Sequence, residues 1–136
     1  MAAKKTFSTV KRPQAAVDVS AYCRDLDQWP RSWMGIEQDL PPGEQLLPHF
    51  RRFIEHLASS SLAPKTIRNH VDNLWNLGGE IIRHLHYDKT LRKLPAERLL
   101  RKSVHELGGP AIHNGSDDQQ RSFDSTCRKL HRFLES

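Results

Sequence analysis

The segment LLPHFRRFIEHLASSSLAPKTIRNHVDNLWNLGGEIIRHLH, residues 46–86, holds two helical patterns separated by a short Ser/Pro turn. Apolar residues recur every three or four positions in both, which places them on one face of an α-helix. The first stripe is Leu46, Leu47, Phe50, Phe53, Ile54 and Leu57. The second stripe is Ile67, Val71, Leu74, Leu77, Ile81 and Leu85. Pro64 suits a first helical position, where its missing N–H is not needed. The sequence therefore predicts two helices that meet at a corner.

Two further helices are predicted in the carboxyl-terminal half. Pro95 begins one that extends to Leu107, and Gly108, Gly109 and Pro110 end it. Its inward residues are expected to be Leu99, Leu100, Val104 and Leu107. Ser116, followed by two aspartates and a glutamine, is typical of a helix start, because side-chain oxygens and negative charge suit the free amides there. That helix runs to Leu134. Since no strand pattern competes, we expect an all-α, orthogonal four-helix bundle over residues 44–136.

The amino-terminal third is irregular. Residues 1–18 are basic and lack periodicity, so we expect a flexible arm, either without a role or lying along phosphate. Residues 19–43 form an irregular extension, with a short helix at Val19–Leu26 and then WPRSW. Trp29 and Trp33 are four residues apart and share a face. We favour packing of both against the core over an exposed aromatic patch for a partner protein. Pro41, Pro42 and Gly43 end this extension and start the first long helix.

Gly78 and Gly79 interrupt the second long helix. Each glycine costs about 1 kcal/mol relative to alanine in a helix interior. Either a neighbouring helix crosses closely there, or the helix ends and a new one begins at Glu80. The apolar stripe continues in register beyond the pair, so we favour a close crossing, with Trp75 near it as a core residue.

Composition places the chain among ordinary soluble proteins. Its 136 residues fit one domain, with 37% hydrophobic and 27% charged residues. No apolar run approaches the roughly 20 residues of a membrane span, and no secretory signal is evident. We expect a cytoplasmic protein. Cys23 and Cys127 stand alone, without metal-binding or redox spacing. Cys127 lies on an apolar stripe, so we expect it to be a small buried side chain.

The two-helix corner resembles the core-binding, SAM-like amino-terminal domain of tyrosine recombinases and phage integrases. The matching positions are Phe50, Phe53, Ile54, Leu57, Leu62, Thr66, Ile67, Arg68 and His70. The run QRSFDSTCRKLHRFLE, residues 120–135, is similar to the closing helix of that domain. The resemblance spans residues 43–136 and implies a SAM-like fold that contacts DNA. The catalytic domain that follows in that family is not among these residues, and neither Tyr22 nor Tyr87 has the Arg and His setting of an activated nucleophile. We therefore expect no recombination chemistry.

Candidate DNA contacts surround the start of the second long helix. A helix amino end offers free N–H groups and the positive end of the dipole, which suit phosphate. The side chains there are Lys65, Thr66, Arg68 and Asn69. The resemblance implies that the closing helix also faces DNA, which adds Arg128, Lys129 and Arg132. The third helix presents Arg98, Arg101 and Lys102, either as phosphate contacts or as an ordinary solvated face.

The charge balance predicts modest, salt-sensitive DNA affinity. The net charge is +5, of which the segment from Tyr87 to Leu107 carries +3. Weak binding by the chain alone indicates a partner, such as a recombinase or another protein subunit.

Chemistry by the chain itself is not expected. The histidine pairs His84/His86 and His49/His56 have poor metal-ligand spacing, and no catalytic motif is present. We expect no enzyme activity, cofactor, small-molecule substrate or membrane contact. The favoured hypothesis is an accessory or regulatory DNA-binding factor in recombination or integration by a mobile element. The alternative is a helical adaptor that docks a partner protein through Trp29 and Trp33.

Overall fold

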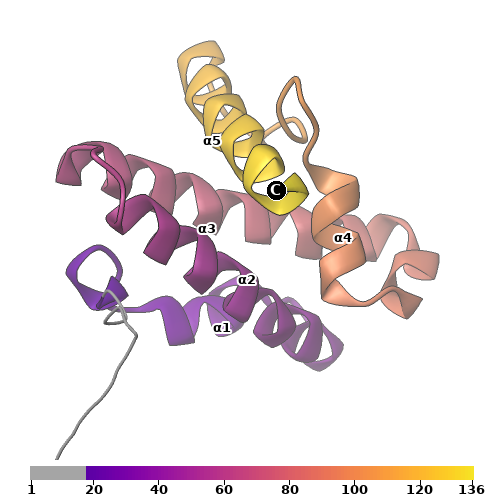
Figure 1. Ribbon diagram of the computed structural model, residues 1–136. Helices are drawn as coiled ribbons and strands as arrows, with labels where there is room; N and C mark the ends of the chain where they lie inside the picture. The colour runs from indigo at the N-terminus through magenta and orange to yellow at the C-terminus, as the bar shows by residue number, and fades with distance from the viewer. Residues whose placement is uncertain (1–17) are drawn as a thin grey trace, which may run out of the picture.

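The computed structural model describes residues 18–136, and this part of the chain is helical without strands (Figure 1). The helices are α1 (Trp29–Trp33), α2 (Leu40–Ala58), α3 (Pro64–Tyr87), α4 (Ala96–Ser103) and α5 (Asp117–Glu135). Short 3-10 turns occur at η1 (Val19–Ala21), η2 (Leu26–Gln28), η3 (Glu37–Asp39) and η4 (Lys89–Lys93). The all-α prediction is confirmed. Of the expected basic arm, only Asp18 lies within the described residues, where its carboxylate caps η1. No helix in residues 18–136 is sufficiently long and apolar to cross a membrane.

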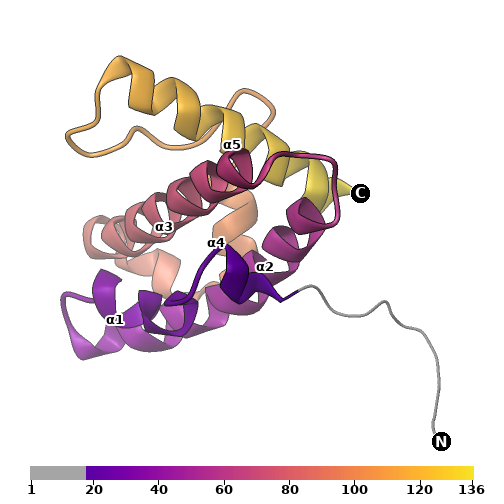
Figure 2. The same ribbon diagram turned by 90° about the vertical axis from the view of Figure 1, so that its left-hand side faces the viewer.

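The core forms where α2 and α3 pack along their apolar faces, on either side of the turn at residues 59–63. Both predicted stripes are buried, apart from the half-buried Leu47. Val19, Leu26 and Trp29 belong to the same core, so the irregular segment packs with the long helices. Figure 2 shows α1 and α5 on opposite sides of α3. Cys127 is fully buried, as predicted.

The helix α3 is continuous through Gly78 and Gly79. The indole ring of Trp33 lies directly on Gly78, where any side chain would overlap the ring. Trp33 Nε1 also donates a hydrogen bond to the carbonyl of Trp75, at 3.0 Å. The expected close approach is confirmed, but a side chain from α1 makes it rather than another long helix.

The three tryptophans differ in their surroundings. Trp29 is 4% exposed, and its ring and that of Trp33 each pack edge-on against Phe50, with centroids 6.2 Å apart. Packing of both residues against the core is confirmed, with Trp29 buried and Trp33 partly buried. Trp75 is 42% exposed, with its Nε1 donating to Ser32 Oγ, so the expectation of a core role for Trp75 is wrong.

The helix α2 begins at Leu40, beside the predicted start at Pro41–Gly43, because Pro41 and Pro42 fit a first turn that needs no N–H from them. Two other predicted helix boundaries are wrong. The helix expected at residues 19–26 is only the single turn η1, and η2 follows it.

The second error concerns the end of α4, which stops at Ser103 instead of Leu107. The chain then reverses through two backbone hydrogen bonds between His105 and Gly108. Gly108 has a φ of +146°, which only glycine adopts readily. Leu107 is therefore 75% exposed instead of facing the core.

Candidate nucleic-acid interface

The amino end of α3 is open to solvent. Ala63 precedes the helix and provides no side-chain cap, and Pro64 has no N–H. Ile67 N–H donates to the carbonyl of Ala63, which leaves the N–H groups of Lys65 and Thr66 without partners in residues 18–136. No acidic residue lies in this first turn. The amino end of α3 therefore presents two free N–H donors at the positive end of the helix dipole.

The predicted side chains at this end are accessible. Lys65, Arg68 and Asn69 are exposed, and Thr66 is half-buried. None of the four makes an ion pair or a side-chain hydrogen bond within residues 18–136. The guanidinium of Arg68 lies 6.0 Å from the ring centre of Tyr22, at the distance limit of a cation–π contact. Asp72, one turn beyond Arg68 on α3, is an exposed acidic residue near these side chains.

The structure divides the basic residues of α5. Lys129 comes three residues after Thr126, which contacts His70 of α3, so it lies on the flank of α5 nearer to α3. Arg128 is turned towards the opposite flank, where its Nη1 lies 3.5 Å from the carbonyl of Leu107. Arg132 is exposed. Lys129 is thus brought to the α3 side, whereas Arg128 is not.

The basic residues of α4 are in different situations. Arg101 forms ion pairs with Glu97 at 3.3 Å and with Glu135 at 3.1 Å, and donates to the carbonyl of Leu134. Its guanidinium fastens the end of α5 to α4 and is not free for phosphate. Arg98 and Lys102 are exposed. The charges of α4 therefore do not form one binding group.

A buried polar seam fixes α5 against α3, and the sequence did not predict it. Asn73 Nδ2 donates to Thr126 Oγ1 at 2.8 Å and to the hydroxyl and carbonyl of Ser122. His70 Nδ1 lies 2.7 Å from Thr126 Oγ1. Burial, and then the charge of Lys129, lowers the pKa of His70, which favours the neutral ring in this contact. This seam fixes the face of α5 that carries Ser122 and Thr126 against α3.

Replacing Thr126 by valine is expected to lower the free energy of unfolding by about 1–2 kcal/mol, because His70 and Asn73 each lose a buried partner. Thr126→Ser keeps the hydroxyl and should cost less. Urea denaturation of the two variants measures the difference. Equal losses would mean that the methyl packing of Thr126 matters and its hydroxyl does not.

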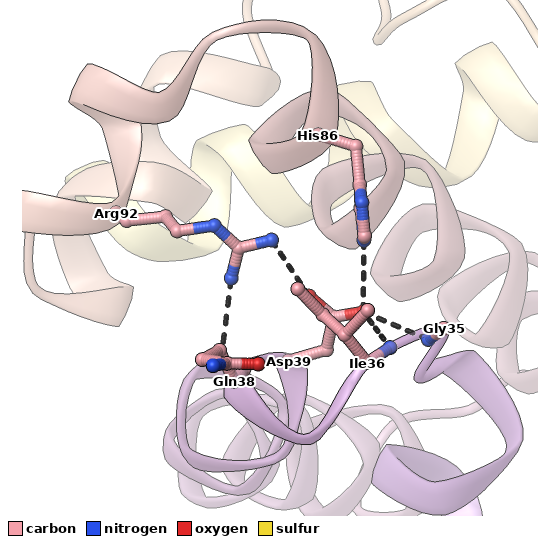
Figure 3. A network of polar contacts seen from close by, with 6 residues as sticks. All are labelled: Gly35, Ile36, Gln38, Asp39, His86 and Arg92. Atoms are coloured by element: carbon pink, nitrogen blue, oxygen red, sulfur yellow. Dashed lines mark hydrogen bonds and ion pairs between the residues drawn. The ribbon is translucent and has the colours of Figure 1, made fainter.

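A second polar cluster joins η3 to the end of α3 and to η4 (Figure 3). The side chain of Asp39 is fully buried. Its Oδ2 accepts from the N–H groups of Gly35 and Ile36 and from His86 Nε2, and its Oδ1 accepts from Arg92 Nη2 at 2.8 Å. Burial alone raises the pKa of Asp39, but these hydrogen bonds outweigh it and lower the pKa to about 2. The cluster ties η3 to the end of α3 and to η4.

Comparisons of this chain with known protein families, curated proteins and solved structures found no match. The geometry of the described residues and the resemblance in sequence are therefore what bear on function.

Proposed function

We propose that this chain is a non-enzymatic DNA-binding module whose four long helices form a SAM-like, core-binding arrangement. The observation that carries the proposal is the exposed, unpaired and cationic amino end of α3. Lys65 and Arg68 supply two exposed positive charges there, and two backbone N–H groups point out of the helix end.

The chemistry of this surface suits the DNA backbone first. Phosphate oxygens accept from free backbone amides and from Lys or Arg, and such contacts position a protein without reading sequence. Lys129 adds a third charge from α5. Asn69, one turn into α3, has an amide that suits a base edge.

The biological setting rests on the resemblance in sequence. A core-binding domain contacts DNA on behalf of a recombinase, so we place this chain as an accessory or regulatory factor in recombination or integration by a mobile element. Three cations give weak binding by the chain alone, which favours action beside a second protein subunit.

Binding to random duplex DNA is expected to be salt-dependent. With three phosphate contacts, affinity should fall about fortyfold between about 50 and about 200 mM salt. The double variant Lys65→Glu, Arg68→Glu should lose at least about tenfold in affinity, and its salt slope should decrease by about two. Fluorescence anisotropy with a labelled duplex measures both quantities.

The matched control is Arg31→Glu, Lys93→Glu, which changes the net charge equally at exposed residues elsewhere. This variant should retain most of the affinity. Equal losses in the two double variants would show that net charge alone matters and that α3 is not the contact surface. Absence of binding at low salt would refute the DNA proposal itself.

A further inference from the structure

A polar hollow of about 370 Å³ lies between α3, α5 and the loop at residues 112–115. Its α3 wall presents the amides of Asn69, Asn73 and Asn76, and Ser122 lies on the α5 wall. Ile112 and His113 supply an apolar side chain and an imidazole on the loop wall. Hydrogen-bonding groups therefore occupy one side of the hollow, and groups that can lie against a flat ring occupy another.

Asn73 holds an unpaired acceptor at this hollow. The residue is 9% exposed, and its Nδ2 is bound by Ser122 and Thr126. These bonds prevent a flip of the side-chain amide of Asn73. No group in residues 18–136 donates to Asn73 Oδ1. A buried carbonyl oxygen without a donor costs free energy, and a ligand with an N–H group in the hollow would satisfy it.

The loop wall is held in place by its backbone. The N–H of His113 donates to the buried Glu80 at 3.0 Å, and the N–H of Ile112 donates to Gln120 Oε1 at 2.8 Å. Asn114 has a φ of 60°, a left-handed conformation that Asn tolerates. The hollow is therefore a formed feature of the described fold and does not depend on closure of the loop.

We propose that this hollow binds one unstacked nucleobase that carries an exocyclic amino group, as adenine, cytosine and guanine do. The amino group would donate to Asn73 Oδ1, and the amides of Asn69 and Asn76 would donate to ring nitrogen or carbonyl acceptors. Ile112 and His113 would cover the ring face, as apolar and aromatic side chains do for extruded bases. Thymine carries no exocyclic amino group, and its one donor, the ring N3–H, is flanked by two carbonyl oxygens that would face Asn73 Oδ1, so thymine would bind more weakly.

The base could belong to a free nucleotide or to an unpaired position in DNA, and in the second case the inference rests on the proposed function. Asp72 also lines the hollow, so a phosphate is disfavoured inside it. The base would therefore enter the hollow, with its sugar and phosphate outside.

The first test is titration of the ¹⁵N-labelled chain with dAMP, dCMP and dTMP, followed by amide shifts in NMR spectra. The expected result is shifts at residues 69–76 and 112–115, with dAMP or dCMP binding at least about fivefold tighter than dTMP, as one hydrogen bond implies. Deoxyribose 5-phosphate should leave these amides unshifted. Equal response to all three nucleotides, or none, would overturn the proposal.

The double variant Asn69→Ala, Asn76→Ala removes two amides that make no hydrogen bond within residues 18–136. It should fold normally and lose at least about tenfold in nucleotide affinity. The control variant Gln28→Ala, Gln45→Ala removes two exposed amides elsewhere and should bind as the parent does. Equal affinity in all three proteins would overturn the assignment.

DNA hairpins with and without one unpaired adenine separate the two sources of the base. If the hollow takes a base from DNA, the bulged hairpin binds tighter than the paired one, and the single variant Asn76→Ala, which lies outside the proposed duplex contacts, reduces only this extra affinity. If it takes free nucleotides, the two hairpins bind equally while the dAMP response persists. Failure of both hairpins at low salt refutes the DNA function but leaves the nucleotide titration to decide the hollow.

Discussion

Replacing Gly78 by alanine is expected to lower the free energy of unfolding by about 3 kcal/mol. The new Cβ would overlap the ring of Trp33, which is itself packed against Trp29 and Phe50. The ring must move, and losing the packing of a large aromatic side chain costs about 3–5 kcal/mol. Alanine recovers only about 1 kcal/mol through its better helix propensity. Thermal or urea denaturation measures the net effect.

The neighbouring glycine provides the control. A Cβ at Gly79 would lie 3.5 Å from Trp33 Cδ1, an ordinary contact. Gly79→Ala should therefore raise the free energy of unfolding, by up to about 1 kcal/mol. In a Trp33→Ala background, Gly78→Ala should become neutral or stabilising, because the clash is gone. If Gly78→Ala and Gly79→Ala behave alike in the parent chain, Trp33 does not pack on Gly78.

Replacing Asp39 by alanine is expected to cost about 3–4 kcal/mol. The variant removes a fully buried carboxylate that accepts from Gly35, Ile36, His86 and Arg92. Breaking a buried ion pair from one side costs about 3–5 kcal/mol. Since Arg92 and His86 are partly exposed and can regain water, the lower part of that range applies. Chemical denaturation at neutral pH measures the loss.

The exposed pair Asp27–Arg51 is the control, since Asp27→Ala should cost less than about 1 kcal/mol. If the two alanine variants lose equal stability, the buried cluster does not hold α3 and η4 to η3.

The same cluster predicts acid sensitivity. The pKa of Asp39 is lowered to about 2 in the folded chain, from an ordinary value of 3.8. The folded state thus binds the proton less readily, so this stabilisation is complete above about pH 4 and is lost as the pH falls towards 2. The shift corresponds to about 2 kcal/mol. Asp39→Ala should flatten this part of the stability curve; an unchanged pH dependence would place the acid sensitivity in other groups.

Helix content and buried faces were predictable because they depend on spacing within one segment. The stripes of α2 and α3 are buried as their periods predicted, and the start of α5 at Asp117 follows from Ser116. Its hydroxyl accepts from Gln119 N–H, while the Gln119 side chain accepts from Ser116 N–H. Such caps are local, so the sequence reveals them. The end of α4 was missed because a turn with Gly108 in a left-handed conformation competes with an apolar pattern that continues to Leu107.

The candidate site was only partly predictable. Exposure of Lys65 and Arg68 follows from their positions opposite the α3 stripe. The sequence did not indicate that Glu97 and Glu135 engage Arg101, or that Arg128 and Lys129 point to different flanks. A signal for the seam was present in His70 and Asn73, polar residues beside the buried stripe, but their partners on α5 lie about fifty residues away in the chain.

The sequence alone determined that the chain is all-α, which faces of α2, α3 and α5 are apolar, and that α3 begins with cationic residues. The spacing of apolar residues and the residues at the helix ends act within a few turns of one helix. Each helical segment therefore specifies its own apolar face and its own ends. Tertiary structure alone decided the burial of Asp39, the exposure of Trp75 and the hollow beside Asn73. Ion pairs, hydrogen bonds and ring contacts act over a few ångströms. They therefore depend on how helices distant in sequence pack together, which no local pattern specifies.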